Sequence, residues 1–554
     1  MDIQLRSLID AARKTSTKNI QPTYSSFAEL ITERKVHSSE QDIYLVYYDM
    51  DGIRTEYSYP HFIELVSKTA QFYLNSGIHG GDRIAIAAHN HPDTIIQYFA
   101  AWMIGACIVP LNMTEDDKRI QYILENSSAR LLLCRSEYMA RISSIYDDKN
   151  IVVQEVDTES HQHKMYDELI ASQEEYTCET YADNLSTEAL IVYTSGTTGN
   201  PKAVVLDQRN LMIDAHCISE WHRITKDSRM MCVLPVHHVN GCVVTHVTPM
   251  YAHASVVLNR KFSTEAFFTR IDEEKVTVVS VVPTLLAYLL EGNIPLDAYS
   301  NTTLQHIICG AGPLTCDLAS NFENTFNIPI IHGYGLSETT CYSSFLPIDQ
   351  SKELHKEYMF NYGFPSIGIP IPCNEMQIHD IDGNPLPENT RGEIVIRGTN
   401  VMKEYYNNDS ANQETFAHKW FRSGDEGFWI TGKDNNPYFF ITGRIKELII
   451  RGGVNLAPLE IDEVLSRAPG VKAGICVGFE NDFYGEEVGA LIIPDNDAVY
   501  QNEIIEYCKQ HLPFSKQPKC VIFTDQLPVT STGKYQRNTV KHLFSEYKNI
   551  QFKK

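Results

Sequence analysis

The stretch GDRIAIAAHNHPDTIIQYFAAWMIGACIVPLN, residues 81–112, decides the fold. GDRIAIAAHN (81–90) has the pattern of a strand that leaves a turn, PDTIIQYFAAWMIGA (92–106) has helical spacing, and CIVPLN (107–112) is a second apolar run. A helical segment at 116–128 and a strand at 129–134 continue the order. Because parallel strands need a crossover between them, this alternation predicts a parallel β-sheet covered by helices.

The same alternation of strands and helices returns later in the chain, and after about residue 360 the sequence pattern changes. Strands and one helix recur in KVTVVSVVP (275–283), TLLAYLLEG (284–292), LQHIICGAG (304–312) and IPIIHGYG (328–335). Over about 360–440, frequent Gly and Pro between short β-rich runs predict a small β-barrel-like subdomain. We therefore expect an α/β protein with an N-terminal domain over 1–445, made of parallel sheets covered by helices plus this subdomain, and a small α+β C-terminal domain over 446–554.

The bulk composition excludes several classes of protein. The 554 residues are 43% hydrophobic and 21% charged, which is typical of a globular chain with several structural units. The net charge of −23 argues against binding to nucleic acid or to an anionic membrane surface. No window approaches eighteen consecutive apolar residues, so we expect no membrane span. The 13 cysteines form no Cys-x-x-Cys pair, which indicates reduced thiols and a cytoplasmic location.

The strongest local signal is the loop Thr194-Ser195-Gly196-Thr197-Thr198-Gly199-Asn200-Pro201-Lys202, which follows the strand-like run EALIVY. Glycines let the backbone approach a phosphate closely, and hydroxyl and N–H groups can donate to its oxygens. Lys202 adds a positive charge. Hydroxyl-rich loops are common on surfaces, and this one is not a Walker A loop, so its interpretation depends on the other segments of the chain.

Further segments follow in the chain, and together they resemble one family. They are Gly310-Ala311-Gly312-Pro313-Leu314, Gly333-Tyr334-Gly335-Leu336-Ser337-Glu338, Ser423-Gly424-Asp425, Thr442-Gly443-Arg444 and Leu527–Arg537 with Lys534. With the loop at 194–202, this set resembles the adenylate-forming superfamily. That superfamily holds acyl-CoA synthetases, nonribosomal peptide adenylation domains and firefly luciferase. The chain is most similar to a stand-alone, AMP-forming acyl-CoA synthetase.

The resemblance implies a nucleotide site. Gly310, Ala311 and Gly312 would border the adenine, with Tyr334 stacked on the base. Asp425 would accept hydrogen bonds from the ribose hydroxyls, and Arg444 would give a second ribose or phosphate contact. Three positions depart from the family pattern: Ser337 and Ser423 replace threonine, and Ala203 replaces the glycine that usually follows the loop lysine.

The resemblance also implies the chemistry. A carboxylate attacks the α-phosphorus of ATP, pyrophosphate leaves, and a thiol then takes the acyl group from the adenylate. Glu338 would bind Mg²⁺, Ser337 would contact the α-phosphate, and Lys534 would be the catalytic lysine that bridges carboxylate and phosphate. ATP, Mg²⁺ and coenzyme A are the implied cofactors.

The C-terminal domain is mobile in this family. Lys446 matches the hinge, and Gly452 and Gly453 match the loop that faces the pantetheine tunnel of CoA after the domain rotates. The expected partners are therefore a small-molecule carboxylic acid and CoA, or a carrier protein supplied in trans.

The choice of acid depends on fewer residues. His238 and Asn240 fall in the segment that resembles the pocket mouth, and His332 adds polarity nearby. These groups predict a small or polar acid rather than a long fatty acyl chain, although interior histidines with purely structural partners remain an alternative. Three other functions stay open at this point: an adenylation enzyme that loads a carrier protein, a luciferase-like monooxygenase, and a catalytically silent nucleotide-binding protein.

Overall fold

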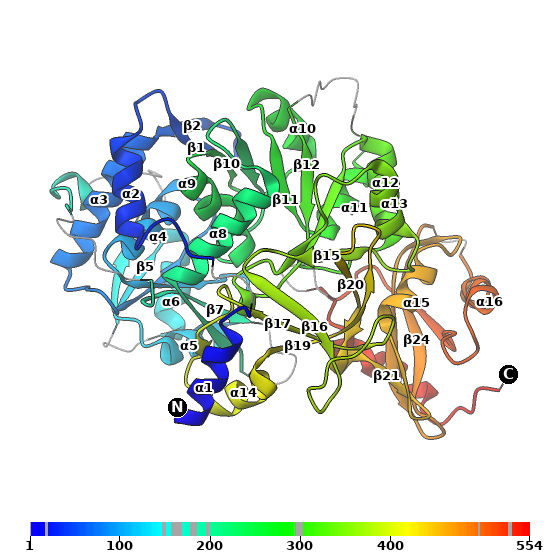
Figure 1. Ribbon diagram of the computed structural model, residues 1–554. Helices are drawn as coiled ribbons and strands as arrows, with labels where there is room; N and C mark the ends of the chain where they lie inside the picture. The colour runs from blue at the N-terminus through cyan, green and yellow to red at the C-terminus, as the bar shows by residue number, and fades with distance from the viewer. Residues whose placement is uncertain are drawn as a thin grey trace.

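The computed structural model describes residues 2–16, 20–146, 151–156, 169–177, 185–194, 200–292, 294, 303–496, 499–529 and 535–553. Three β-sheets organise them. In Figure 1 the N-terminal half lies on one side of the molecule, the strands of the middle of the chain occupy the centre, and the C-terminal part forms the opposite end.

The largest sheet has 13 strands and runs through the centre of the molecule. Its order is β16 (Asn374–His379), β17 (Gly392–Gly398), β19 (Phe421–Thr431), β20 (Pro437–Arg444), β15 (Ser366–Pro370), β14 (Ser344–Phe345), β13 (Ile330–Tyr334), β12 (His306–Cys309), β11 (Val278–Val281), β9 (Arg229–Cys232), β10 (Ser255–Asn259), β1 (Ile43–Tyr48) and β2 (Arg54–Ser58). The strands from β13 to β1 pair in parallel, as the alternating pattern predicts. The β-rich region after 360 is antiparallel, and β14 and β15 join it edge to edge with the parallel part.

The second sheet has seven strands and contains the strands of the stretch 81–112. Its order is β18 (Glu404–Tyr405), β8 (Lys202–Asp207), β7 (Glu188–Thr194), β4 (Cys107–Leu111), β3 (Arg83–Ala87), β5 (Leu131–Cys134) and β6 (Val152–Glu155). Along β3, Ile84 and Ile86 face the largest core, whereas Ala85 and Ala87 face a second core. Because successive side chains of a strand point to opposite faces, both faces of this sheet are buried.

Helices fill the space between the two sheets and cover their outer faces. α4 (Pro92–Met103) is buried at all its residues, and α8 (Gln208–His222) at most of them, because both contribute to the core that the two sheets share. The other helices before the C-terminal part are α1 (Ile3–Ala12), α2 (Phe27–Val36), α3 (Tyr59–Asn75), α5 (Asp117–Ser127), α6 (Ser136–Ile145), α9 (Thr248–Ala252), α10 (Thr264–Glu273), α11 (Pro283–Glu291), α12 (Cys316–Phe326), α13 (Lys352–Phe360) and α14 (Asp409–Thr415). Among the described residues, no helix is both long and apolar enough to cross a membrane.

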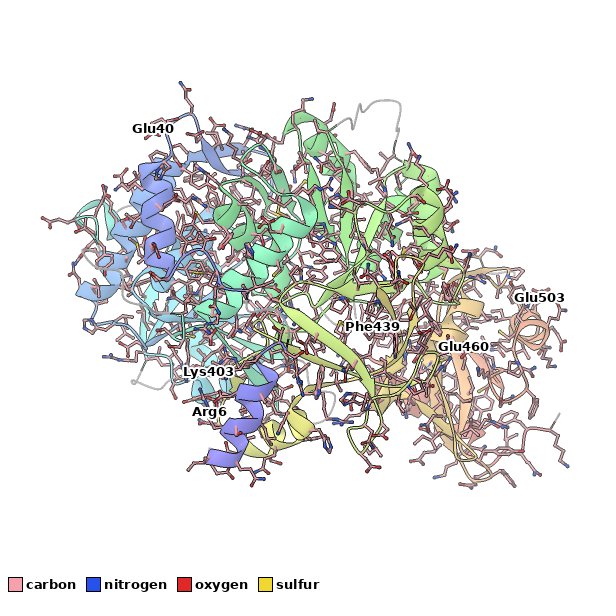
Figure 2. The ribbon with its side chains drawn as sticks, viewed as in Figure 1. Arg6, Glu40, Lys403, Phe439, Glu460 and Glu503 are labelled. Atoms are coloured by element: carbon pink, nitrogen blue, oxygen red, sulfur yellow. The ribbon has the colours of Figure 1, made fainter. Side chains whose placement is uncertain are left out.

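The C-terminal part has a third sheet and cores of its own. Strands β22 (Val454–Leu456), β21 (Ile449–Arg451), β24 (Gly485–Pro494) and β23 (Val471–Asn481) follow in that order, with β25 (Cys520–Phe523) paired to β24. Helices α15 (Pro458–Leu465) and α16 (Gln501–His511) pack beside it. Figure 2 shows Phe439 of β20 and Glu460 of α15 near the junction with the large sheet, where Glu460 pairs with Arg391 at 3.4 Å.

Candidate functional site

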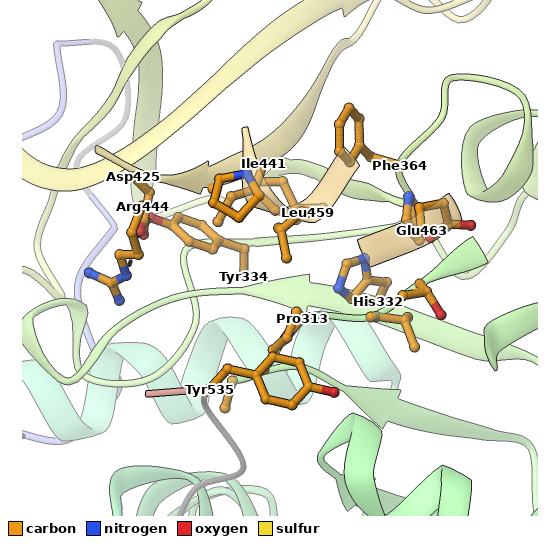
Figure 3. A pocket seen from close by; sticks show the side chains of 18 of the residues that line it. Pro313, His332, Tyr334, Phe364, Asp425, Ile441, Arg444, Leu459, Glu463 and Tyr535 are labelled. Carbon is orange, nitrogen blue, oxygen red and sulfur yellow. Dashed lines mark hydrogen bonds and ion pairs between the residues drawn. The ribbon is translucent and has the colours of Figure 1, made fainter. Parts of the chain in front are cut away.

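A cavity lies where the carboxyl ends of β12 and β13 meet the antiparallel strands and α15. Ligands of open α/β sheets bind outside the carboxyl ends of the strands, so this is the expected place for a site. Its lining comes from five chain segments and the C-terminal part: residues 311–315, 332–335, 364, 365, 367, 425, 441, 443, 444, 447, 458, 459, 463, 535 and 537. Figure 3 shows the side chains of Tyr334, His332, Asp425 and Arg444 gathered at this cavity.

Asp425 joins Tyr334 and Arg444 in the cavity wall. Tyr334 donates its hydroxyl to Asp425 Oδ2 at 2.6 Å, and Arg444 Nε lies 2.8 Å from Asp425 Oδ1. Asp425 is 1% exposed, and its ion pair raises the pKa of Arg444 above its ordinary value. β19 and β20 pair Asp425 directly opposite Arg444, which explains why residues 19 positions apart meet here. The structure therefore brings together three of the residues predicted for the nucleotide.

The turn after β12 lies against β13 on the same wall. Gly310 needs to be glycine, because a Cβ atom there would lie 2.8 Å from the carbonyl oxygen of Gly333. Ala311 adopts φ +64°, a left-handed conformation that costs free energy for any residue but glycine. Ala311 and Gly312 line the cavity beside Tyr334. A flat base could enter at this wall because small side chains leave the space open.

His332 faces the same cavity as a neutral ring. Its Nδ1 lies 2.9 Å from the carbonyl oxygen of Ser366 and must donate to it, because a carbonyl only accepts. Burial lowers the pKa of His332 to about 4, so the ring carries no second proton at neutral pH. Nε2 is then an acceptor. His332 lines the cavity together with Tyr334 and offers it this acceptor.

Lys202, Tyr405 and Glu338 form a separate polar group at the edge of the second sheet. Lys202 Nζ lies 4.6 Å from the centre of the Tyr405 ring, a cation–π contact, and Tyr405 donates its hydroxyl to Glu338 Oε1 at 2.8 Å. Tyr405 reaches this position because β18 pairs with β8, the strand that Lys202 begins. Tyr405 lies in no motif that could signal it from the sequence, since the pairing of β18 with β8 is a tertiary contact.

The surroundings of the phosphate loop are partly described. Thr194 ends β7, and its carbonyl accepts from Arg119 Nη2 at 3.1 Å. Ser337 begins a short 3₁₀ helix, Ser337–Thr339, that carries Glu338. The predicted loop residues Ser195, Gly196, Thr197, Thr198 and Gly199 lie outside the described residues, and so does Lys534.

The donor set fits a magnesium ion that is held mainly by ATP. Within the described ranges, no group of three or more His, Cys, Asp or Glu side chains gathers into a metal cluster. Glu338 instead offers a single carboxylate, and one of its oxygens is oriented by Tyr405. Mg²⁺ is typically bound by one or two carboxylates together with substrate phosphates and water, so one glutamate suits this arrangement.

Asn240 and His238 are not among the residues that line this cavity. Asn240 begins the π-helix η1 (Asn240–Val247); its Nδ2 donates to Tyr342 Oη at 3.2 Å and its Oδ1 accepts from Ser280 at 2.8 Å. His238 lies just before this helix, with its ring centroid 4.4 Å from that of His237. Asn240 thus holds a tyrosine in place rather than presenting a free polar group.

The C-terminal part closes one side of the cavity. The backbone N–H of Cys316 donates to Glu463 at 3.1 Å, and Arg467 pairs with Asp317 at 2.7 Å, both across the junction with α12. Tyr535, the residue after Lys534, lines the cavity, as does Arg537.

The predicted hinge and CoA-loop residues lie elsewhere on this part. Lys446 is exposed in the 3₁₀ turn Ile445–Glu447 between β20 and β21. Gly452 and Gly453 form the exposed β21–β22 turn with φ of +58° and +81°, and neither is part of the cavity wall.

Comparison with known proteins agrees with this geometry. The family model for AMP-binding enzymes matches residues 32–406, and the model for the C-terminal domain of AMP-binding enzymes matches residues 460–534. The sulfoacetate–CoA ligase of Cupriavidus necator is 31% identical over 84% of this chain and 88% of its own. The oxalate–CoA ligase of Arabidopsis thaliana is 30% identical over 87% and 92%.

Solved structures share the fold over nearly the whole chain. ATP-bound MatB from Rhodopseudomonas palustris superposes with a TM-score of 0.83 at 23% identity, covering 94% of this chain and all of that one. The o-succinylbenzoate CoA synthetase MenE from Bacillus subtilis, in complex with its acyl-adenylate intermediate, gives 0.79 at 27% identity, with 94% and 98% covered.

The fold and the site define an adenylate-forming acid–thiol ligase. The chain belongs to the AMP-binding enzyme family. It is an AMP-forming acid–CoA ligase that uses ATP and CoA, with Mg²⁺ as the metal typical of the family, and it acts on a carboxylic acid. The predicted fold class and reaction are confirmed.

Proposed function

We propose that this ligase activates a small, polar carboxylic acid that lies beside Gly333. The observation that carries this proposal is the position of Tyr342. A Cβ atom added at Gly310 would lie 2.7 Å from Tyr342 Oη, and one added at Gly333 would lie 2.8 Å from Tyr342 Cε1. The ring thus fills the volume directly behind the glycine wall, and the bonds through Asn240 and Ser280 hold it there. A long acyl chain would need that volume.

The names of the relatives are compatible with several acids and do not decide among them. Two relatives are named for sulfoacetate and oxalate, which are small anions. Others, at 27% identity, are named for feruloyl-CoA and indoleacetate, which are aromatic. The filled space behind Gly333 favours an acid of the first kind for this chain, because burying a larger group would require Tyr342 to move out of a packed interior.

The nucleotide would occupy the cavity between β13 and the antiparallel strands. Gly310, Ala311 and Gly312 would border the adenine, and Tyr334 would stack on it. Asp425 and Arg444 would hold the ribose and a phosphate. Support comes from the shared wall these residues form and from the buried position of the Asp425 carboxyl, whose oxygens can accept hydroxyl hydrogens.

The phosphates would extend toward Lys202 and Glu338. The loop Thr194–Gly199 and Ser337 would donate to phosphate oxygens, Lys202 would supply positive charge, and Glu338 would bind Mg²⁺, which neutralises phosphate charge when bound. A carboxylate oxygen of the acid attacks the α-phosphorus, the bond to the bridging oxygen breaks, and pyrophosphate leaves with the electron pair. Lys534 would be the catalytic residue that neutralises the two anions as they approach.

Thioester formation would follow after a domain movement. The CoA sulfur attacks the acyl carbon, AMP leaves, and the thiol proton passes to solvent. We place the boundary between domains at 445/446 with Lys446 as the hinge, and Gly452 and Gly453 beside the pantetheine arm. This is supported by the two hydrophobic clusters formed from residues between 449 and 552. The location would be cytoplasmic, in keeping with the free thiols of the twelve described cysteines, and cell fractionation would check it.

A pyrophosphate-release screen with ATP and Mg²⁺ tests the substrate proposal, run with and without CoA over acids from two carbons to aromatic and long-chain ones. We expect release with small polar acids, acceleration by CoA, and loss of both in Lys534→Ala. Tyr342→Ala should extend activity to bulkier acids, whereas Tyr342→Phe, which keeps the ring, should not. A wild-type preference for long-chain acids would show that Tyr342 does not limit the pocket, and an adenylate that CoA never discharges would point to a carrier protein as acceptor.

A further inference from the structure

A strained turn directly follows the residue proposed to bind the metal. Thr340 has φ +66° and ψ −60°, and the N–H of Cys341 donates to the carbonyl of Thr339 at 2.8 Å. These values define a γ-turn of the positive-φ type, which is rare and unfavourable, and more so for a β-branched residue. Such a conformation persists only where surrounding contacts enforce it.

The contacts that enforce the turn come from one buried side chain and its own backbone. Asn400 is 0% exposed, and its backbone carbonyl oxygen accepts the Thr340 hydroxyl at 2.6 Å. Its Nδ2 donates to the carbonyl of Tyr342 at 2.9 Å, on the other side of the turn. Asn400 therefore bonds to the residues on both sides of Cys341, Thr340 and Tyr342.

Asn400 is itself fixed from two further elements. Its Oδ1 accepts from Asn374 of β16 at 2.6 Å, and its Nδ2 also donates to Asp214 of α8 at 3.0 Å. Three atoms of Asn400, its Oδ1, Nδ2 and backbone carbonyl oxygen, thus make four hydrogen bonds to three segments of the fold: the turn itself, β16 and α8. The turn also packs against Gly335: the carbonyl oxygen of Cys341 occupies the space that a Cβ atom would take at that glycine.

The segment that begins at Asn400 also holds Glu338. The N–H of Met402 donates to the carbonyl of Glu338 at 2.7 Å, and Tyr405 donates to the Glu338 carboxylate at 2.8 Å. Glu338 is therefore fixed by its backbone and its carboxylate to residues two and five positions after Asn400. The strained turn then fixes the chain just after Glu338.

We propose that Asn400 is a positioning residue for the metal site: it clamps the turn at Thr340 and so sets where the Glu338 carboxylate lies. This inference rests on the proposed role of Glu338 in Mg²⁺ binding. Residues that orient a metal-binding carboxylate through hydrogen bonds commonly change metal affinity by one to two orders of magnitude when they are removed.

The experiment compares Asn400→Ala with Asn259→Ala as a matched control. Asn259 is also buried, at 1% exposed, and its Nδ2 donates to the carbonyl of Cys232 at 3.0 Å, but it lies on β10. Circular dichroism and the melting temperature establish that each variant is folded. The readouts are the Kd for Mn²⁺ in the presence of ATP without acid, measured by electron paramagnetic resonance, the KM for Mg²⁺ in pyrophosphate release, and the Kd for AMP.

Asn400→Ala removes the side-chain bonds to Tyr342, Asn374 and Asp214 and keeps the backbone bond to Thr340. We expect it to raise the Mn²⁺ Kd and the Mg²⁺ KM by about tenfold or more, with a smaller change in the Kd for AMP. Asn259→Ala should leave the metal readouts unchanged. Thr340→Val, which keeps the shape and removes only the hydroxyl, should shift the Mn²⁺ Kd in the same direction by a smaller factor, and it serves if Asn400→Ala does not fold.

Two results would overturn the inference and can be told apart. Wild-type protein that binds Mn²⁺ with ATP, together with Asn400→Ala and Thr340→Val variants that match it, would remove the positioning role alone. Wild-type protein that shows neither ATP-dependent Mn²⁺ binding nor acid-dependent pyrophosphate release would remove the proposed function of the site, and the inference with it.

Discussion

Replacing Asp425 by asparagine removes one negative charge from the ribose end of the cavity while keeping the shape of the side chain. Asp425 is 1% exposed, accepts from Tyr334 at 2.6 Å and pairs with Arg444 at 2.8 Å. The asparagine oxygen can still accept the Tyr334 hydroxyl. Arg444 is 39% exposed at its side chain, so loss of its ion pair is softened by solvent and the protein should stay folded.

The expected effect on nucleotide binding follows from the hydrogen bonds that change. Hydrogen bonds to a charged group contribute about 1.5–3 kcal/mol each, and neutral ones about 0.5–1.5 kcal/mol. Two ribose hydroxyls that meet an amide instead of a carboxylate would lose about 2–3 kcal/mol together, or roughly 30–150-fold in affinity. The KM for ATP should rise in parallel.

Titration calorimetry with AMP measures this loss directly, and a thermal melt checks that the variant is folded. Glu426→Gln is the matched control, because Glu426 is the next residue on β19 and its carboxylate accepts from Thr442 at 2.6 Å instead. A Kd for AMP within about twofold of wild type in Asp425→Asn would refute the ribose role, since that is below half a kcal/mol. Equal weakening in both variants would show that a general change in the sheet, not the ribose contact, is responsible.

Three further predictions concern stability and the second half-reaction. Burial lowers the pKa of His246, His306 and His332 to about 4. Below pH 6.5 the unfolded chain therefore binds more protons than the folded one, and the free energy of unfolding should fall toward pH 4 by up to about 3 kcal/mol for each ring. Urea unfolding at pH 7.5, 5.5 and 4.5 checks this, and constant stability would contradict it. Burial raises the pKa of Asp214 to about 8. Asp214→Asn removes a carboxyl that ionises more readily in the unfolded chain, so it should stabilise the fold by about 1–3 kcal/mol at pH 7, and more at pH 8 than at pH 5. Urea midpoints that fall at both pH 5 and pH 8 would show that the carboxyl is needed. Lys446→Pro should leave adenylate formation largely intact and abolish thioester formation, measured as pyrophosphate release without CoA and acyl-CoA by chromatography; equal loss of the two would rule out a hinge at this residue.

Much of the architecture was predictable because it depends on local patterns. The apolar periodicities of 81–134 and 275–335 predicted strands and helices that the structure confirms, with each bound within three residues of the predicted one. The pattern did not say that these two stretches build different sheets, since period and length carry no information on which strands pair. Likewise, Gly and Pro marked the β-rich region after 360, but its edge-to-edge continuation through β14 and β15 depends on contacts between distant residues.

Some residues of the candidate site could also be predicted from the sequence, and others could not. Asp425, Arg444, Tyr334 and Glu338 could be found from short motifs, because each lies on a turn or strand end whose local chemistry is visible in the sequence. Tyr405 could not, because it reaches Glu338 and Lys202 only through the pairing of β18 with β8.

The residues predicted to contact the acid show most clearly what the sequence could not predict. The sequence placed His238, Asn240 and His332 together as polar neighbours of a substrate. In the structure His332 lines the cavity with Tyr334, and Asn240 bonds to Tyr342 and Ser280. Their role toward the acid stays a prediction. The sequence by itself determined the family, the order of the elements and the chemistry of its motifs. Only the tertiary structure decided that Tyr342 fills the space behind Gly310 and Gly333, because a packed interior is set by which distant surfaces meet and not by the residues on either one.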